Sequence, residues 1–354
     1  MLGKFNKPFF VAEISANHKG SIINAKNLIK IAKDNGADAV KLQTYKPSTM
    51  TVKSKKKYFQ INSGLWKGQS LWNLYSKAQT PYEWHKTLFD FANKINIKIF
   101  SSPFDESAVN FLEKLNCPFY KIASFEMNDL TLIKKAISTK KHVIISTGMA
   151  SIKEISLIFN QIKKLGTKKI TLLYCVSNYP SKISDFNLNN IKILKKKFKC
   201  EIGFSDHSND PRIAAAAVKS GATVIEKHIC LKNIRALDSE FSISDKEIHD
   251  YKKAISYPNG VIKDKKLYKK LLGKKIFFRN KSEEDSKKFR RSIFVIKNVK
   301  KGDIFTKKNI RKIRPGYGLS PIYYEKILGS KSNFDIEAFE PLTKKFVKNL
   351  KLKL

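Results

Sequence analysis

Short β-branched apolar runs alternate with amphipathic helical stretches from residue 9 to about residue 257 of this chain. Such alternation is typical of strand–helix units that build a parallel sheet. Eight strands are predicted, which is the number that closes a (β/α)8 TIM barrel of about 250 residues. We therefore expect an α/β fold with one barrel. The predicted strands span residues 9–14, 39–43, 97–102, 119–123, 142–147, 170–175, 201–205 and 223–228.

Helices are predicted between these strands where apolar residues recur at helical spacing, several of them after a capping Ser, Thr or Asp. One connection, residues 45–81, is much longer than an ordinary strand-to-helix loop and carries Trp66 and Trp72. Long loops at the top of a barrel are often functional lids, and a packing flap is the alternative. The predicted helices span residues 24–35, 82–95, 106–115, 152–165 and 211–220.

The pattern changes after residue 257, where a Lys-rich stretch over residues 264–288 shows little periodicity. Beyond it, short alternating strands and turns at residues 301–303 and 315–316 indicate a compact second domain, with a short helix predicted at residues 307–311. We expect a barrel domain over residues 1–260, a linker over residues 261–288 and a small second domain over residues 289–354.

Composition limits the classes of function. The formal charge is +40, which raises the question of nucleic acid, but only seven of the 70 basic residues are Arg and the Lys is spread along the whole chain. A binding stripe would cluster its charges and favour Arg, so we expect solvated surface Lys and no nucleic-acid partner. No apolar run approaches a membrane span or a signal peptide. The four cysteines are scattered without metal or disulfide spacing, so we expect a cytoplasmic protein with no membrane partner.

Polar residues concentrate where the predicted strands end. In this class of barrel the carboxyl ends of the strands form the site. Buried polar groups are unfavourable unless they are satisfied, so a ring of this polarity indicates a ligand better than it indicates core. The ring contains Glu13, Lys41, Gln43, Ser102, Lys121, Ser124, Glu126, Ser146, Ser177, Tyr179, Ser205, His207, Glu226 and His228.

Two Lys and several Ser hydroxyls that converge on one cavity suit a small anion with phosphate and carboxylate groups. The alternative is that Lys41 and Lys121 each form a structural ion pair. His207 and His228 end adjacent strands and could hold one divalent ion through imidazole nitrogens. Two His without close spacing are a weak metal signal, and satisfied core or surface histidines are the alternative.

Several motifs make a specific resemblance. The segments VAEISANHKGSIINAKNLI, GADAVKLQTY, SSPFDESAVNFLEKL, YKIASFEMNDL, STGMAS, IGFSDHSNDP and GATVIEKHICL resemble, in order, the sialic acid synthase family. The segments FRRSIFVIKNVKKGD and IRPGYGLSP resemble that family's C-terminal antifreeze-like (SAF, β-clip) domain. Within the family, the ISANH motif, SGLWKGQSLWNLY and TPYEWH resemble the pseudaminic acid synthases. The linker GKKIFFRNKSEEDS differs from the Tyr-Gly-containing linker of the family.

The resemblance implies a transferase in which C3 of phosphoenolpyruvate attacks the aldehyde of an open-chain N-acetylated amino sugar, water adds at C2 and phosphate leaves by C–O cleavage. The expected sugar is 2,4-diacetamido-2,4,6-trideoxy-altropyranose, and neuraminate or legionaminate synthases that use the corresponding hexose are the alternative. A nucleic-acid or ice-binding protein is the rival from another class. A homodimer is also implied, in which the SAF domain of one subunit covers the partner's barrel and Arg314 touches the sugar's acyl group.

Residue roles follow from the same resemblance. His207 and His228 would hold a divalent metal, Mn²⁺ in the first place with Mg²⁺ or Co²⁺ as alternatives. Glu13 and Glu126 would manage protons and sugar contacts, and Asp238 would contact the sugar or order metal-bound water, together with Gln43 and Tyr179. The residues expected to cradle phosphoenolpyruvate are Lys41, Ser102, Lys121, Ser124, Ser146, Ser177 and Ser205.

Overall fold

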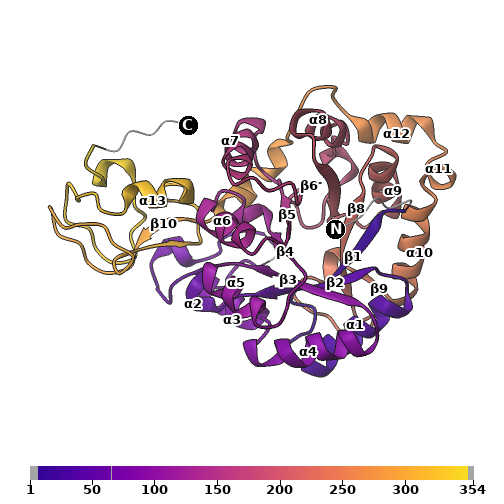
Figure 1. Ribbon diagram of the computed structural model, residues 1–354, viewed down its shortest axis with the longest axis horizontal. Helices are drawn as coiled ribbons and strands as arrows, with labels where there is room; N and C mark the ends of the chain where they lie inside the picture. The colour runs from indigo at the N-terminus through magenta and orange to yellow at the C-terminus, as the bar shows by residue number, and fades with distance from the viewer. Residues whose placement is uncertain (1–6, 65, 350–354) are drawn as a thin grey trace.

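A closed parallel barrel forms the larger part of the computed structural model, which describes residues 7–64 and 66–349 (Figure 1). The first eight strands follow one another in chain order, and β1 pairs with both β2 and β8, so these eight strands close into a barrel, while the two-residue β9 (Ile243–Ser244) also pairs with β8. The predicted TIM barrel is therefore confirmed. Its strands are β1 (Phe9–Glu13), β2 (Ala39–Thr44), β3 (Lys98–Pro103), β4 (Phe119–Ile122), β5 (His142–Ser146), β6 (Ile170–Cys175), β7 (Glu201–Asp206) and β8 (Val224–Cys230).

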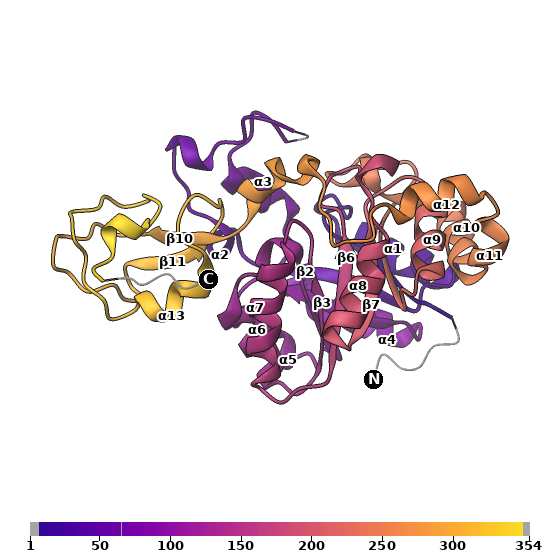
Figure 2. The same cartoon turned by 90° about the horizontal axis from the view of Figure 1, so that it is seen from above.

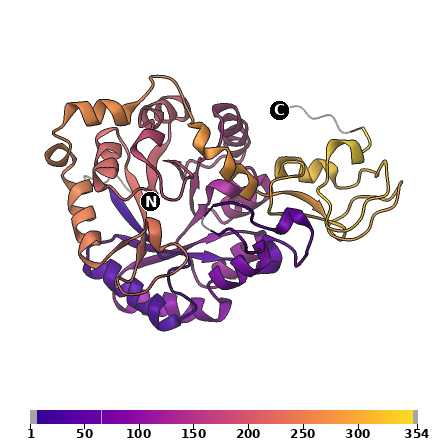
Figure 3. The same cartoon turned by 180° about the vertical axis from the view of Figure 1, so that it is seen from behind.

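Helices surround the barrel on its outer face, as the view from behind shows (Figure 3). Strands such as β1 and β6 are buried at every position, because helices cover one face and the barrel interior the other. The described residues include no helix that is long and apolar enough to cross a bilayer. The outer helices are α1 (Ile22–Asp34), α4 (Tyr82–Lys94), α5 (Glu106–Glu113), α6 (Leu130–Ser138), α7 (Ile152–Lys163), α8 (Asn189–Phe198), α9 (Pro211–Lys219) and α10 (Asp245–Ser256).

The long connection after β2 contains two short helices, α2 (Pro47–Met50) and α3 (Leu71–Ala78). It forms a hydrophobic cluster of its own, in which Tyr45, Phe59 and Leu71 are buried together with Phe294 of the C-terminal domain. The connection is therefore packed against both the barrel and the C-terminal domain.

The linker is more ordered than its sequence indicates. The linker sequence shows little helical periodicity, and the expectation of an irregular segment is wrong for α12 (Lys265–Leu272). This helix follows the short helix α11 (Pro258–Val261). The Asp264 side chain caps α12 by accepting the backbone N–H groups of Lys266 and Leu267 at 2.7 and 3.1 Å. Leu271 is fully buried against the barrel and supplies the apolar contact that a Lys-rich helix of this length needs.

The C-terminal domain lies beside the barrel and contacts the long connection (Figure 2). Its antiparallel strands are β10 (Ser292–Val295) and β11 (Ile310–Ile313). The helix predicted at residues 307–311 is wrong, because Thr306 N–H donates to Asn309 Oδ1 at 2.7 Å in a turn and β11 begins at Ile310. The apolar residues at both ends of β11 are buried, and pairing with β10 outweighs the local helical tendency.

Candidate active site

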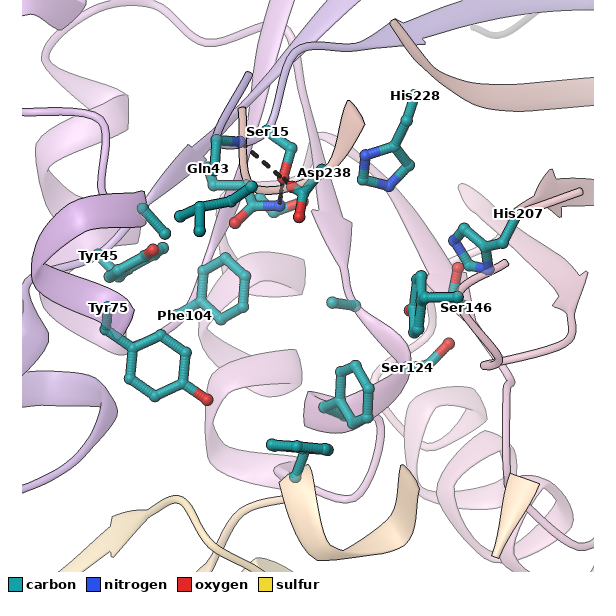
Figure 4. A pocket seen from close by; sticks show the side chains of 18 of the residues that line it. Ser15, Gln43, Tyr45, Tyr75, Phe104, Ser124, Ser146, His207, His228 and Asp238 are labelled. Atoms are coloured by element: carbon teal, nitrogen blue, oxygen red, sulfur yellow. Dashed lines mark hydrogen bonds between the residues drawn. The ribbon is translucent and has the colours of Figure 1, made fainter. Parts of the chain in front are cut away.

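A cavity opens at the carboxyl ends of the strands, where the polar ring was expected (Figure 4). Glu13, Glu126 and Ser177 are buried next to residues of the cavity without lining it. The other predicted site residues all line it, namely Lys41, Gln43, Ser102, Lys121, Ser124, Ser146, Tyr179, Ser205, His207, His228, Asp238 and Arg314.

The buried ammonium groups of Lys41 and Lys121 share one carboxylate of the cavity lining, that of Glu226. Glu226 Oε1 lies 2.9 Å from Lys121 Nζ, and Glu226 Oε2 lies 3.7 Å from Lys41 Nζ. Ser205 Oγ donates to the same carboxylate at 3.0 Å. Burial alone would raise the pKa of Glu226, but the two ammonium groups lower it to about 2. The structural ion pairs that we considered for both lysines therefore exist, and they also place two cations at a cavity wall.

Glu226 belongs to the polar ring predicted from the sequence, although no role in binding or catalysis was predicted for it. It stands in the run Glu226–Lys227–His228 within a fully buried strand, and a charged run in such a strand was the available signal. Lys227 lies on the other side of the strand, where its Nζ donates to the carbonyl of Phe241 at 2.9 Å. Burial lowers the pKa of Lys227.

Glu13 does not line the cavity, but it contacts Lys41 and Gln43, which do. Its Oε2 forms an ion pair with Lys41 Nζ, and its Oε1 accepts from Gln43 Nε2 at 3.3 Å. Burial raises the pKa of Glu13 to about 7, against the opposing effect of the Lys41 ammonium. A carboxyl group with this pKa can hold a proton near neutral pH.

Serine hydroxyls form one wall of the cavity. Lys41 Nζ donates to Ser102 Oγ at 3.2 Å, and Gly148 N–H donates to Ser124 Oγ at 3.1 Å. The hydroxyls of Ser146 and Ser177 are buried without a hydrogen-bond partner in the part of the chain that the structure describes. Such groups are normally satisfied, so the hydroxyl of Ser146, which lines the cavity, is available to a bound ligand, whereas that of Ser177 lies next to the cavity.

The two histidines present the form of imidazole that binds metals. His207 Nδ1 lies 2.8 Å from the carbonyl oxygen of Val176, which can only accept, so Nδ1 carries the proton and Nε2 is free to act as a ligand. The rings of His207 and His228 lie 5.6 Å apart between centroids. Burial lowers the pKa of His207 to about 4 and that of His228 well below its usual value, so both rings are neutral near pH 7.

The metal donor set is small. Within residues 7–64 and 66–349, no group of three or more His, Cys, Asp or Glu side chains is arranged to hold a metal ion. His228 Nδ1 is buried without a partner among these residues. Two neutral imidazoles fit a divalent ion that keeps its remaining positions for water and substrate.

Ser15, Gln43 and Asp238 form a second polar group in the lining of the cavity. Ser15 Oγ donates to Asp238 Oδ2 at 2.5 Å, and Gln43 Nε2 donates to Ser15 Oγ at 2.7 Å (Figure 4). Burial raises the pKa of Asp238. The ring of Tyr179, which also lines the cavity, packs against that of His207 with 4.4 Å between their centroids.

Arg314 of the C-terminal domain enters the cavity of its own chain. Its Nη2 and Nε lie 2.7 and 3.1 Å from Glu126 Oε1, and its Nη1 donates to the Tyr75 hydroxyl at 3.2 Å. The ring centroid of Phe125 lies 4.8 Å from the guanidinium carbon. Arg291 Nε donates to the same Glu126 oxygen at 3.3 Å. The structure thus places Arg314 in the cavity of its own chain, whereas the resemblance implied the barrel of a partner subunit.

Aromatic residues close the rest of the cavity, and the sequence-based site assignment missed them. Tyr45, Tyr75 and Trp66 come from the long connection, which thus lines the cavity and also packs against the C-terminal domain. Phe104 and Phe125 follow β3 and β4. Aromatic residues in such loops are hard to distinguish from core residues by sequence, and the length of the connection was the only signal.

Comparisons with known proteins agree with this geometry. The NeuB family profile matches residues 28–266 and the SAF domain profile matches residues 290–348. A pseudaminic acid synthase of Helicobacter pylori is 42% identical over 95% of this chain and 96% of its own length. An N,N'-diacetyllegionaminic acid synthase of Campylobacter jejuni is 36% identical over 91% of this chain and 95% of its own length.

A solved structure gives the same result. The crystal structure of the spore coat polysaccharide biosynthesis protein spsE of Bacillus subtilis superimposes with a TM-score of 0.82 at 29% identity, covering 99% of this chain and 97% of the other. The family profile covers more than half of the chain, and the relatives are matched over nearly their whole length. The chain therefore belongs to the NeuB family and carries a SAF domain after its barrel.

Proposed function

We propose that this protein is a pseudaminic acid synthase, which condenses phosphoenolpyruvate with 2,4-diacetamido-2,4,6-trideoxy-altropyranose and water to give pseudaminic acid and phosphate. The observation that carries the proposal is the convergence of Lys41, Lys121 and several serines on one cavity beside two neutral imidazoles. Three relatives named as pseudaminic acid synthases, each 41 or 42% identical over 95% of this chain, support the choice of sugar.

Phosphoenolpyruvate would bind at the lysine and serine wall. Lys41 and Lys121 supply positive charge, which Glu226 and Glu13 compensate only in part because Glu13 can hold a proton near neutral pH, and the hydroxyls supply hydrogen-bond donors. Arrival of an anion would remove little water, because both ammonium groups are already nearly fully buried. The residues in this role are Lys41, Ser102, Lys121, Ser124, Ser146, Ser177 and Ser205.

His207 and His228 would hold the divalent metal, for which we propose Mn²⁺, with Mg²⁺ or Co²⁺ as alternatives. The ion supplies Lewis acidity that polarises the aldehyde oxygen of the sugar. The chain contributes the geometry, since the Val176 carbonyl fixes the ring of His207 with Nε2 free. Tyr179 packs against that ring and limits its rotation.

The sugar would bind between the histidines and the SAF domain. Gln43, Asp238 and Tyr179 are placed to contact its hydroxyl groups or to order metal-bound water. Arg314 would donate to an acetamido oxygen of the sugar, while the Glu126 carboxylate orients the guanidinium by accepting its hydrogen bonds. Glu13 would exchange a proton through the Lys41 ammonium near the reacting carbons, while the hydrogen bond from Gln43 holds its carboxyl group in place.

The reaction balances as follows. C3 of phosphoenolpyruvate forms a bond to the aldehyde carbon, a water oxygen adds at C2, and the C2–O bond breaks so that the bridging oxygen leaves with phosphate. Phosphoenolpyruvate labelled with heavy oxygen at the bridging position tests this route by mass spectrometry. We expect the label in inorganic phosphate, and label retained in the sugar acid would refute C–O cleavage.

A second candidate is an N,N'-diacetyllegionaminic acid synthase, which the relative of that name supports at 36% identity. The two activities would use the same phosphoenolpyruvate wall and differ only in the configuration of the sugar. The choice between them therefore depends on which sugar the protein consumes.

Assembly and location are further parts of the proposal. A homodimer with exchanged SAF domains would keep every Arg314 contact described above, because closed and domain-swapped forms differ only in the path of the connecting segment. All four cysteines are unpaired, which suits a reducing cytoplasm. The +40 charge is spread over Lys side chains, so we propose no nucleic-acid partner.

A further inference from the structure

A segment of the linker, residues 279–286, binds the loops that follow β5 and β6. Glu283 is only 2% exposed, and its Oε1 accepts the backbone N–H groups of Met149 at 3.0 Å and Ser177 at 2.9 Å. These are charge-assisted hydrogen bonds, and loss of the carboxylate would leave two buried donors without an acceptor. Glu283 therefore fixes the two loops relative to each other.

Arg279 binds the carbonyl groups of the same two loops. Its Nη1 donates to the Cys175 oxygen at 2.7 Å, its Nε donates to the Ala150 oxygen at 3.2 Å, and its Nη2 donates to the Thr147 oxygen. Ser286 Oγ adds a bond to the Ser177 carbonyl at 2.6 Å. One short segment thus satisfies both donors and acceptors of the loops, which holds their peptide groups in one orientation.

The two loops carry hydroxyls of the proposed phosphoenolpyruvate wall. Ser146 ends β5 and Ser177 follows β6, and Gly148 in the loop after β5 lies against the hydroxyls of Ser177 and Ser124. A Cβ atom at Gly148 would lie 2.1 Å from Ser177 Oγ and 2.8 Å from Ser124 Oγ. Because backbone and hydroxyls are already in contact, a small displacement of either loop moves the hydroxyls.

We propose that Glu283 and Arg279 are positioning residues for these serine hydroxyls. This inference rests on the proposed function, because it assigns the hydroxyls to phosphoenolpyruvate. Neither Glu283 nor Arg279 lines the cavity, and a carboxylate at Glu283 would repel an anionic substrate if it were a direct ligand. Both residues act on the substrate only through the loops.

The same segment continues into the SAF domain. Phe289 lines the cavity, and Arg291 donates to Glu126. The linker therefore connects the phosphoenolpyruvate wall to the Arg314 side of the site, so that placement of the SAF domain and placement of the serines depend on one stretch of chain.

The test compares Glu283→Ala and Glu283→Gln with Glu284→Gln. Glu284 is the matched control, because it is the neighbouring carboxylate, its side chain is 61% exposed and it forms an ion pair with Lys287 on the surface. We expect Glu283→Ala to raise the KM for phosphoenolpyruvate about 10-fold or more, as for a disturbed hydrogen bond to a charged ligand. The KM for the sugar should stay within about two-fold. Glu283→Gln should lie between, because its amide oxygen can still accept both N–H groups.

A double-mutant cycle with Ser177→Ala adds a readout that a purely structural role would not change. We expect the effects of Glu283→Gln and Ser177→Ala on the KM for phosphoenolpyruvate to be non-additive, because one acts through the other. Equal rises in both KM values with a lowered melting temperature, or no rise at all, would overturn the inference.

Calorimetric titration of phosphoenolpyruvate alone separates this inference from the proposed function. Wild-type protein that binds no phosphoenolpyruvate would refute the proposed function. Wild-type binding that Glu283→Ala and Glu283→Gln both leave unchanged would refute only the positioning role of Glu283.

Discussion

Arg314 of the SAF domain and Glu126 of the barrel form a buried ion pair, in which Nη2 lies 2.7 Å from Oε1. Arg314 is 7% exposed and Glu126 is fully buried, so each charge depends on the other for its stability. The pair joins Arg314, which lines the cavity, to a barrel carboxylate and makes the SAF domain a part of the site.

The first prediction concerns which chain supplies Arg314. Arg314→Ala and His207→Ala proteins should each be nearly inactive, because one lacks the acetamido contact and the other a metal ligand. In a dimer with exchanged SAF domains, a mixture of the two should regain activity, since one barrel then keeps its metal site and receives an intact Arg314. Subunit exchange is checked by native mass spectrometry. Mixed dimers that stay inactive would assign Arg314 to its own barrel.

The second prediction concerns the metal. His207→Ala should abolish turnover and metal binding while leaving the circular dichroism spectrum unchanged, because it removes a ligand and little core volume. Metal content is measured by elemental mass spectrometry, and His249→Ala, at an exposed position of α10, is the control. Exhaustive chelation should abolish turnover as well. Full activity of metal-free protein would refute the Lewis-acid role.

The third prediction concerns Lys121. Lys121→Ala should raise the KM for phosphoenolpyruvate by about 10- to 100-fold and change the KM for the sugar much less, because the ammonium meets only the anionic substrate. Lys86→Ala is a suitable control, since Lys86 is an exposed lysine paired with Asp90 on α4. Steady-state kinetics with each substrate varied in turn decides the matter, and equal effects on both constants speak against the assignment.

The fourth prediction concerns pH and docking of the SAF domain. Lys312 Nζ lies 2.7 Å from both Glu106 and Asp129 of the barrel. Burial alone would raise the pKa of Glu106, but Lys312 lowers it from 4.5 to about 2. A lowered folded-state pKa contributes stability that is present above pH 4.5 and is lost as the pH falls towards 2.

Melting temperatures between pH 5 and pH 2, roughly the window of this shift, should therefore fall less steeply in Lys312→Met than in wild type. The control is Lys134→Met, which removes an exposed ion pair with Glu325 across the same interface and should leave the slope unchanged. Parallel pH profiles for wild type and Lys312→Met would contradict the assignment.

The barrel could be predicted because its strands are buried on both faces, so that β-branched apolar runs mark them directly. The cavity residues Lys41, Lys121 and His228 were identifiable for the same reason, since charged or titratable residues in such strands contrast with their surroundings, and His207 directly follows the end of β7. Local sequence failed where long-range contacts decide the structure. The local sequence of residues 307–311 predicts a helix, and the pairing of β11 with β10 is the long-range contact that decides against it.

Glu283 shows this limit most clearly. Its sequence neighbours are Lys, Ser and Asp, which indicate a solvated linker. Its partners Met149 and Ser177 stand 134 and 106 residues earlier in the chain. No local pattern could indicate that this carboxylate is buried at the site.

The sugar that the protein consumes tests the central claim most directly. Purified protein with divalent metal and phosphoenolpyruvate is given 2,4-diacetamido-2,4,6-trideoxy-altropyranose, the corresponding legionaminic acid precursor or N-acetylmannosamine, and product mass and phosphate release are followed. We predict a kcat/KM for the altropyranose at least about 100-fold above the others, because buried polar groups of the site would be left unpaired by the wrong configuration. An equal or higher kcat/KM with either other sugar, or no phosphate release with any of the three, would contradict the account.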